Sequence, residues 1–147
     1  MNSPMTPKPF LYILMRTDMA SMNPGKAVAQ GAHAANQFVH EIQQTTTDTG
    51  TGQPDSLSNY MLYNQWRSEC DGHGFGTTIT LGVNEREMRQ AVDFAKRLGF
   101  AAGVVNDPTY PLRDGEVTHL ISVDTCGYIF GDKNELQYLL ARFSLMP

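Results

Sequence analysis

The sequence predicts an α/β fold, a three-layer α/β/α arrangement around a four-stranded, mixed, mainly parallel sheet. Residues 10–15, FLYILM, form a continuous apolar run of the length expected for a strand that is buried on both faces. Amphipathic segments then alternate with further short apolar runs, as in a parallel sheet covered by helices on both sides. The link before the last predicted strand is too short for a helical crossover, which predicts an antiparallel addition there.

The first helix is expected over residues 24–44, because Asn23 can act as the N-cap and Pro24 suits the first helical position. Apolar residues at alternating steps of four and three predict the face that packs on the sheet: Val28, Ala32, Ala35, Val39 and Ile42. Polar residues at the same steps predict a second stripe, nearly opposite the first: Lys26, Gln30, His33 and Gln37. A solvated outer face is one interpretation of this stripe. Its lack of acids and the small residues beside it favour a face that a ligand approaches closely.

The middle of the chain is predicted from local signals. Residues 44–59 are rich in Thr, Ser, Gly, Asp and Pro and are expected to form a loop insertion. A short helix is expected over residues 60–68. A strand at residues 77–83 then leads into a helix with a capping-box pattern at Asn84, and Gly99 suits the left-handed end of that helix.

The last part of the chain predicts two strands and a helix. Residues 101–105 are apolar throughout and are expected to form the third strand, which residues 106–111 should end because two prolines lie among them. The fourth strand is expected over residues 119–123. A last helix is expected to start at Asp132 or Asn134, either of which can act as its N-cap.

The chain of 147 residues is expected to form one domain that spans residues 1–147, with a flexible leader at 1–9. It has neither a signal-peptide pattern nor an apolar run of the roughly 20 residues that span a bilayer, so we expect a cytoplasmic protein without membrane contact. Its two cysteines form no CxxC pair, which argues against a disulfide framework. The net charge of -4 argues against a broad basic face for nucleic acid, so any contact with a polyanion is expected to be local.

Common cofactor and metal motifs are absent from the sequence. Gly25 and Lys26 follow a predicted strand, but Ala20 and Ala27 stand where a phosphate-binding GxxxxGK[ST] loop requires glycine and a hydroxyl. No GxGxxG or GxSxG occurs, and the His, Cys and acidic residues lack the spacing of a metal site. We therefore expect no metal ion.

Polar segments are expected to meet at one edge of the sheet. Residues 16–18 and 107–109 each follow a predicted strand, and the carboxyl ends of parallel strands meet at one edge, beside the start of the first helix. Lys26 and the helix amides favour an anion there, and Asp107 can orient a water for attack on a carbonyl group. Two simpler explanations stay open: a turn that Asp107 forms before a proline, and an ion pair within residues 16–18.

The pattern RxD at residues 16–18, followed by GKxxAQxxHA at residues 25–34, resembles the signature of peptidyl-tRNA hydrolase of the second type, the archaeal and eukaryotic kind. The resemblance extends through Trp66 and the region that ends at Asp107, and so covers most of the chain. It implies hydrolysis of the ester that joins a peptide to the 3′ ribose of tRNA. It also implies that the partner is the acceptor end of peptidyl-tRNA and that no cofactor is needed.

The resemblance further implies roles for single residues. Lys26 would stabilise the developing oxyanion or a nearby phosphate, and Asp107 would position or activate water. The other predicted site residues divide into a catalytic set and a substrate-binding set: His33, Asp18 and Thr118 in the first, and Arg16, Gln30, Thr109 and Arg113 in the second.

The sequence departs from the family pattern after Asp107. It reads Pro-Thr-Tyr-Pro where the family tends to read Ala-Gly-x-Thr, so the hydroxyl expected four residues on is missing, and Thr109 is the candidate replacement. This departure keeps an alternative open, a non-catalytic member of the same fold that binds a small anionic ligand or a protein partner. A homodimer also stays open.

Overall fold

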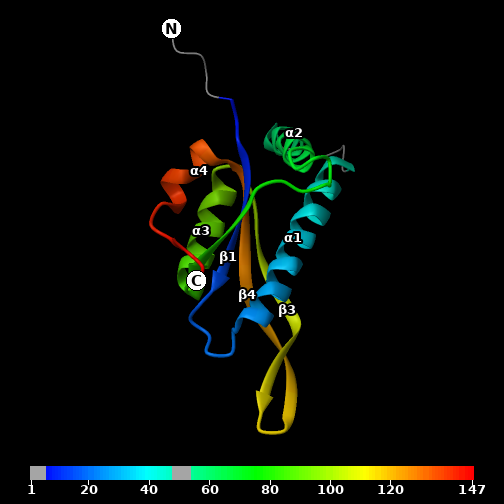
Figure 1. Ribbon diagram of the computed structural model, residues 1–147. Helices are drawn as coiled ribbons and strands as arrows, with labels where there is room; N and C mark the ends of the chain where they lie inside the picture. The colour runs from blue at the N-terminus through cyan, green and yellow to red at the C-terminus, as the bar shows by residue number, and fades with distance from the viewer. Residues whose placement is uncertain (1–5, 48–53) are drawn as a thin grey trace.

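The computed structural model describes residues 6–47 and 54–147. One mixed sheet lies between two helical layers, with α1 and α2 on one face and α3 and α4 on the other (Figure 1). The elements in chain order are β1 (Pro9–Arg16), α1 (Pro24–Thr47), α2 (Pro54–Ser68), β2 (Thr78–Val83), α3 (Glu85–Arg97), β3 (Ala101–Asp114), β4 (Val117–Asp132), α4 (Lys133–Leu140) and β5 (Ser144–Leu145). The predicted α/β class and the three layers are therefore confirmed.

The sheet differs from the prediction in the number and direction of its strands. The described residues form five strands in the order β3-β4-β1-β2-β5, and only the β1–β2 pair is parallel. The prediction of four mainly parallel strands is therefore wrong. It missed the two-residue β5, which is the fifth strand, and it missed residues 126–132 of β4, whose two glycines weaken the local strand signal but which pair antiparallel with the distant β1. Because β4 lies between β1 and β3, those two strands still run in the same direction and toward the same end of the sheet.

Strands β3 and β4 are longer than predicted, at 14 and 16 residues, and form a hairpin that extends beyond the helical layers (Figure 1). The predicted end of the third strand at residues 106–111 is wrong, and so is a fourth strand confined to residues 119–123. Strand β3 lies at the edge of the sheet, where proline is tolerated. The register shifts between Asp107 and Tyr110, which leaves Pro108 outside the ladder and lets the strand continue.

The buried face of α1 differs from the predicted apolar stripe. Its buried residues are Ala27, Gln30, Ala34, Phe38 and Ile42. Val28 is 75% exposed, and Ala32 is also exposed. Phe38 determines this orientation, because an aromatic ring buries more area than valine or alanine and this ring packs against those of Tyr63, Trp66, Tyr128 and Phe130. Gln30 of the polar stripe consequently lies inside the protein, and the two stripes are not opposite each other.

The predicted caps are confirmed. Asn84 forms a capping box at the start of α3, and Gly99 adopts a left-handed conformation with φ of 91° after it ends. Asp132, one of the two predicted candidates, caps α4. At the start of α1 the Asn23 side chain accepts a hydrogen bond from the backbone N–H of Lys26 at 2.9 Å. These signals act within a few residues, which is why the sequence alone locates them.

The predicted loop insertion at residues 44–59 is wrong at both ends. Helix α1 continues to Thr47 and α2 begins at Pro54, while residues 48–53 lie outside the described residues. Packing of α2 against the core overrides its weak helical composition, since Trp66 is only 2% exposed. Of the predicted leader, residues 1–5 also lie outside the described residues, and Pro9 already belongs to β1. Within the described ranges, no helix combines the length and apolar character needed to cross a membrane.

Candidate active site

A network of buried polar side chains joins α1 to the β3–β4 hairpin. The Thr125 hydroxyl of β4 donates to Gln30 Oε1 at 2.7 Å, and Gln30 Nε2 donates to Asp107 Oδ2 at 2.7 Å. These three residues are 0%, 2% and 7% exposed, and in the described part of the chain they are the only buried polar residues. A buried polar group costs free energy unless it is hydrogen-bonded. The buried polar network of Thr125, Gln30 and Asp107 therefore restrains the Gln30 amide and orients the carboxylate.

The other carboxylate oxygen of Asp107 is bound by Thr109. Asp107 Oδ1 accepts from the Thr109 backbone N–H at 2.8 Å and from its hydroxyl at 3.0 Å. Burial opposes ionisation of Asp107, but the donors of Gln30 and Thr109 outweigh it, so the pKa of Asp107 lies below the ordinary aspartate value. Asp107 is therefore ionised at neutral pH. The turn predicted for Asp107 is present, and the same carboxylate also faces α1.

Lys26, Gln30 and His33 lie on one face of α1, at spacings of four and three residues. Through Gln30 this face meets Asp107, and His33 Nε2 lies 3.9 Å from Asp107 Oδ2, with the His33 side chain 52% exposed. The Lys26 ammonium lies 5.1 Å from the centroid of the Tyr110 ring, which is a cation–π contact. The amide end of α1 adds positive potential at the same place. A carboxylate, an ammonium group and an imidazole thus gather along the first turns of α1.

Arg16 and Asp18 lie on the other face of the sheet. Side chains alternate along β1, and the odd-numbered residues of 11–15 pack on the α1 face, so Arg16 points toward α3. Arg16 Nε donates to Asp18 Oδ1 at 2.9 Å, and the backbone N–H of Glu85 donates to Asp18 Oδ2 at 3.2 Å. The bond from Arg16 is the main reason why the pKa of Asp18 lies below its ordinary value. The predicted ion pair within residues 16–18 is therefore present, and the structure does not bring these residues to Asp107.

Arg113 and Thr118 lie near the tip of the β3–β4 hairpin, where they are exposed and opposite each other in register. Arg113 Nε donates to the Gly115 carbonyl oxygen at 3.1 Å. Their position is three residue pairs beyond the Tyr110–Ile121 pair, or roughly 10 Å at the usual rise per residue. The structure therefore does not bring these two predicted residues to Asp107.

Sequence reasoning missed Thr125 and Tyr110 as neighbours of the site. Thr125 occupies a core-facing position beside the apolar residues 126–130, so a polar residue at the start of a buried run was the available signal. Tyr110 is fully buried, and its hydroxyl lies 2.9 Å from Ser21 Oγ in the segment that leads to α1. The bulge after Asp107 turns Tyr110 toward α1, and nothing local in the sequence predicts that turn.

The side chains described around Asp107 support neither a metal site nor a cysteine nucleophile. Within residues 6–47 and 54–147, no three His, Cys, Asp or Glu side chains are arranged to hold a metal ion. Cys126 adjoins Thr125, but burial raises the pKa of its thiol to about 11. The thiol is therefore protonated at neutral pH and is not a nucleophile there.

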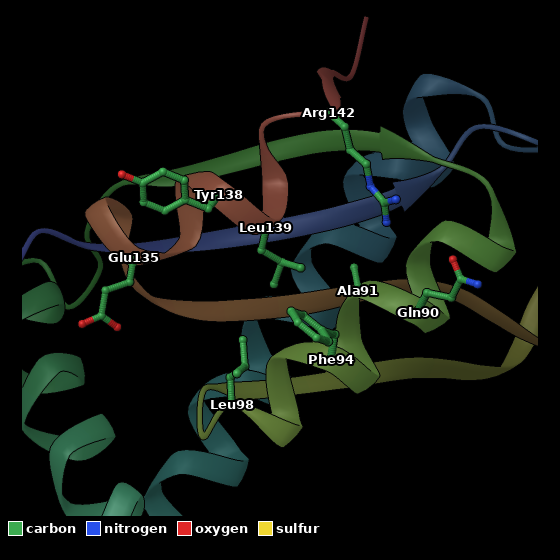
Figure 2. A pocket seen from close by; sticks show the side chains of 8 residues that line it. All are labelled: Gln90, Ala91, Phe94, Leu98, Glu135, Tyr138, Leu139 and Arg142. Carbon is green, nitrogen blue, oxygen red and sulfur yellow. The ribbon is translucent and has the colours of Figure 1, made fainter.

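An apolar groove between α3 and α4 lies away from this cluster. Figure 2 shows Leu139 of α4 pointing toward Phe94 and Ala91 of α3, with Glu135 and Arg142 at the ends. None of the predicted site residues lines this groove. The cluster of Lys26, His33 and Asp107 lies on the opposite side of the sheet.

The fold and the cluster together define an α/β protein with an ionised carboxylate, an ammonium group and an imidazole at the end of the sheet where β1 stops. A family model described as peptidyl-tRNA hydrolase PTH2 matches residues 10–126, which is most of the chain. The chain therefore belongs to the peptidyl-tRNA hydrolase PTH2 family, and the resemblance seen in the sequence is confirmed. The match includes the whole buried polar network as well as Lys26 and His33. A search of curated proteins found no match.

Proposed function

We propose that this protein hydrolyses the ester bond between the peptide and the tRNA in peptidyl-tRNA, which recycles the tRNA in the cytoplasm. The supporting observation is the buried polar network, which orients an ionised Asp107 beside His33 and on the α1 face that carries Lys26. Membership of a peptidyl-tRNA hydrolase family supports the choice of substrate.

Ester hydrolysis requires an oriented water, a group that stabilises the oxyanion and a proton for the leaving oxygen. Asp107 has a lowered pKa and is a weak base, so its role is to accept a hydrogen bond from water and to orient the His33 imidazole. His33 takes a proton from the water as it attacks the carbonyl carbon and returns this proton to the ribose 3′ oxygen, acting first as general base and then as general acid. The Lys26 ammonium stabilises the negative charge on the carbonyl oxygen. These steps require neither a metal ion nor an organic cofactor.

The contact with tRNA is expected to be small. The chain carries a net charge of -4, and the arginines near the end of β1, Arg16 and Arg89, are paired with carboxylates on the α3 face. If the protein contacts few phosphates, the logarithm of its association constant for tRNA should fall with the logarithm of the salt concentration at a slope of about -1 to -3. Extensive phosphate contacts give a slope of about -10. Filter binding to tRNA over a salt series measures this slope, and a steep dependence would contradict a local contact.

The direct test is release of peptide from a peptidyl-tRNA by the purified protein. Lys26→Ala is expected to lower kcat by about 10²- to 10³-fold, the usual effect of removing one oxyanion-stabilising group. Lys96→Ala is the matched control, because Lys96 is exposed on α3, and it should retain wild-type activity. Equal activity of wild type and Lys26→Ala would remove Lys26 from the mechanism. Absence of turnover by the wild type would contradict the proposed function and leave non-catalytic binding as the alternative.

A further inference from the structure

The outer part of the β3–β4 hairpin, residues 111–120, forms an arm that projects past the start of α1 (Figure 1). Strand β4 pairs with β1 only as far as Cys126, and in the described part of the chain the two strands of the arm pair only with each other. The arm therefore presents both of its faces outside the core.

The two faces of the arm are defined by the cross-strand register. Side chains of directly paired residues lie on the same face, and successive pairs alternate between the faces. The inner face continues from Tyr110 and its partner Ile121, and comprises Leu112, Asp114, Val117 and His119. The outer face comprises Pro111, Arg113, Thr118 and Leu120.

The inner face is continuous with the candidate active site. Its first residue, Tyr110, lies beneath the Lys26 ammonium and is bound through its hydroxyl to Ser21. Beyond Tyr110 the inner face exposes apolar side chains to solvent, since Leu112 is 37% exposed and Val117 is 56% exposed. The inner face is thus a strip that runs outward from the place where the ester would lie, with Leu112 and Val117 exposed beside Asp114 and His119, whose Oδ2 and Nε2 atoms lie 4.0 Å apart.

The charge on the arm indicates which half of the substrate fits there. Residues 111–120 carry one arginine, Arg113, against two acids, Asp114 and Glu116, and the arginine lies on the outer face. A weakly acidic surface with exposed apolar side chains is unfavourable for phosphate groups but suits an extended peptide. The tRNA half of the substrate is therefore excluded from this strip, and the peptide half remains.

We infer that the inner face of the arm binds the peptidyl part of the substrate, with Leu112 and Val117 contacting apolar side chains of that peptide. This inference rests on the proposed function, and it assigns a specificity for peptide length and hydrophobicity. From Tyr110 to the tip the strip is long enough for about four extended residues at the usual rise of a strand. A substrate with a single acylated amino acid would be cleaved without reaching Val117.

The test compares two substrates and two variants. The substrates are N-acetyl-aminoacyl-tRNA and a tRNA that carries an apolar pentapeptide. The variants are the double substitution Leu112→Thr with Val117→Thr on the inner face and the single substitution Leu120→Thr on the outer face. Leu120 is 63% exposed, and threonine preserves the preference for strand at each position.

The inner-face variant is expected to lose about tenfold in kcat/KM on the pentapeptidyl substrate, as expected from weakened burial of two side chains. It should cleave N-acetyl-aminoacyl-tRNA like the wild type, and Leu120→Thr should match the wild type on both substrates. The inference would be overturned, with hydrolysis itself intact, if the inner-face variant lost kcat/KM equally on both substrates or on neither. It would also be overturned if Leu120→Thr showed the same loss as the inner-face variant. A wild type that cleaves neither substrate would overturn the proposed function, and the inference with it. Sedimentation provides a further check: a dimer that the inner-face variant abolishes would assign the strip to self-association and overturn peptide binding.

Discussion

Gln30 lies at the centre of the buried polar network, so its replacement by methionine tests how that network stabilises the protein. Gln30→Met keeps the length and approximate volume of the side chain but removes both of its polar atoms. Asp107 Oδ2 then loses a donor at 2.7 Å, and the Thr125 hydroxyl loses an acceptor at 2.7 Å. Both groups remain buried, so water cannot easily replace the lost partner.

The size of the effect follows from these two losses. A hydrogen bond to a charged group contributes about 1.5–3 kcal/mol, and a buried hydroxyl without its partner costs about 1–3 kcal/mol. The Thr125 hydroxyl retains a weak contact with Cys126 Sγ at 3.6 Å, and methionine adds apolar burial, so the sum is an upper bound. We expect Gln30→Met to lower the free energy of unfolding by about 2–5 kcal/mol. This is a large part of the 5–15 kcal/mol that is typical of a domain.

The loss is also expected to depend on pH. The pKa of Asp107 in the folded state lies below its unfolded value, so the associated stability is present above the unfolded pKa and is lost as the pH falls through the folded pKa. Gln30→Met raises the folded pKa toward the unfolded value. The difference in unfolding free energy between wild type and variant should therefore be largest above about pH 4 and should shrink in more acid solution.

Urea unfolding at several pH values measures both effects. Gln90→Met is the control, because Gln90 is exposed on α3 and the same substitution there should change the unfolding free energy by less than about 0.5 kcal/mol. A loss below about 0.5 kcal/mol in Gln30→Met, or a loss that does not change between pH 7 and pH 3, would refute the reasoning from the buried polar network.

Two further predictions concern the two faces of the sheet. Phe38→Ala should lower the free energy of unfolding by about 3–5 kcal/mol, since Phe38 is fully buried among four aromatic rings, and thermal unfolding checks this. Asp18→Asn should cost about 1 kcal/mol of stability through the weakened Arg16 pair but leave peptide release within about twofold of wild type. A much larger fall in peptide release by a folded Asp18→Asn would mean that Asp18 takes part in the reaction despite its position.

Local signals in the sequence predict those features of the fold that depend only on residues close together in the chain. The apolar run of β1 is one such feature. The helix caps are others, because each capping side chain accepts a hydrogen bond from a backbone N–H nearby: Asn23, Asn84 and Asp132. The face of α1 is different. Its predicted apolar stripe contains no aromatic residue, so the larger Phe38, whose aromatic partners come from α2 and β4, determines which side is buried.

Long-range pairing explains the parts that the sequence did not predict. The inner half of β4 is a strand because it pairs with β1, and this pairing brings Thr125 to Gln30. The predicted site residues on α1 share one helix face and so remain together. Arg16 does not join them, because side chains alternate along a strand. Residue 15 points to the α1 face of the sheet, so residue 16 points to the α3 face. Thr118 separates because the arm carries it away from the sheet.

The central claim is that the Asp107 carboxylate, oriented by Gln30 and Thr109, orients the water that cleaves the ester. Single-turnover release of peptide by Asp107→Asn, compared with Asp124→Asn, tests this claim most directly. Asp124 is a suitable match because it too is a carboxylate whose pKa lies below the ordinary value, in its case owing to bonds from Asn106 and Arg89 on the α3 face. We predict a fall of at least about 10²-fold for Asp107→Asn and a rate within about twofold of wild type for Asp124→Asn. Equal rates for the two variants, with both folded, would contradict it.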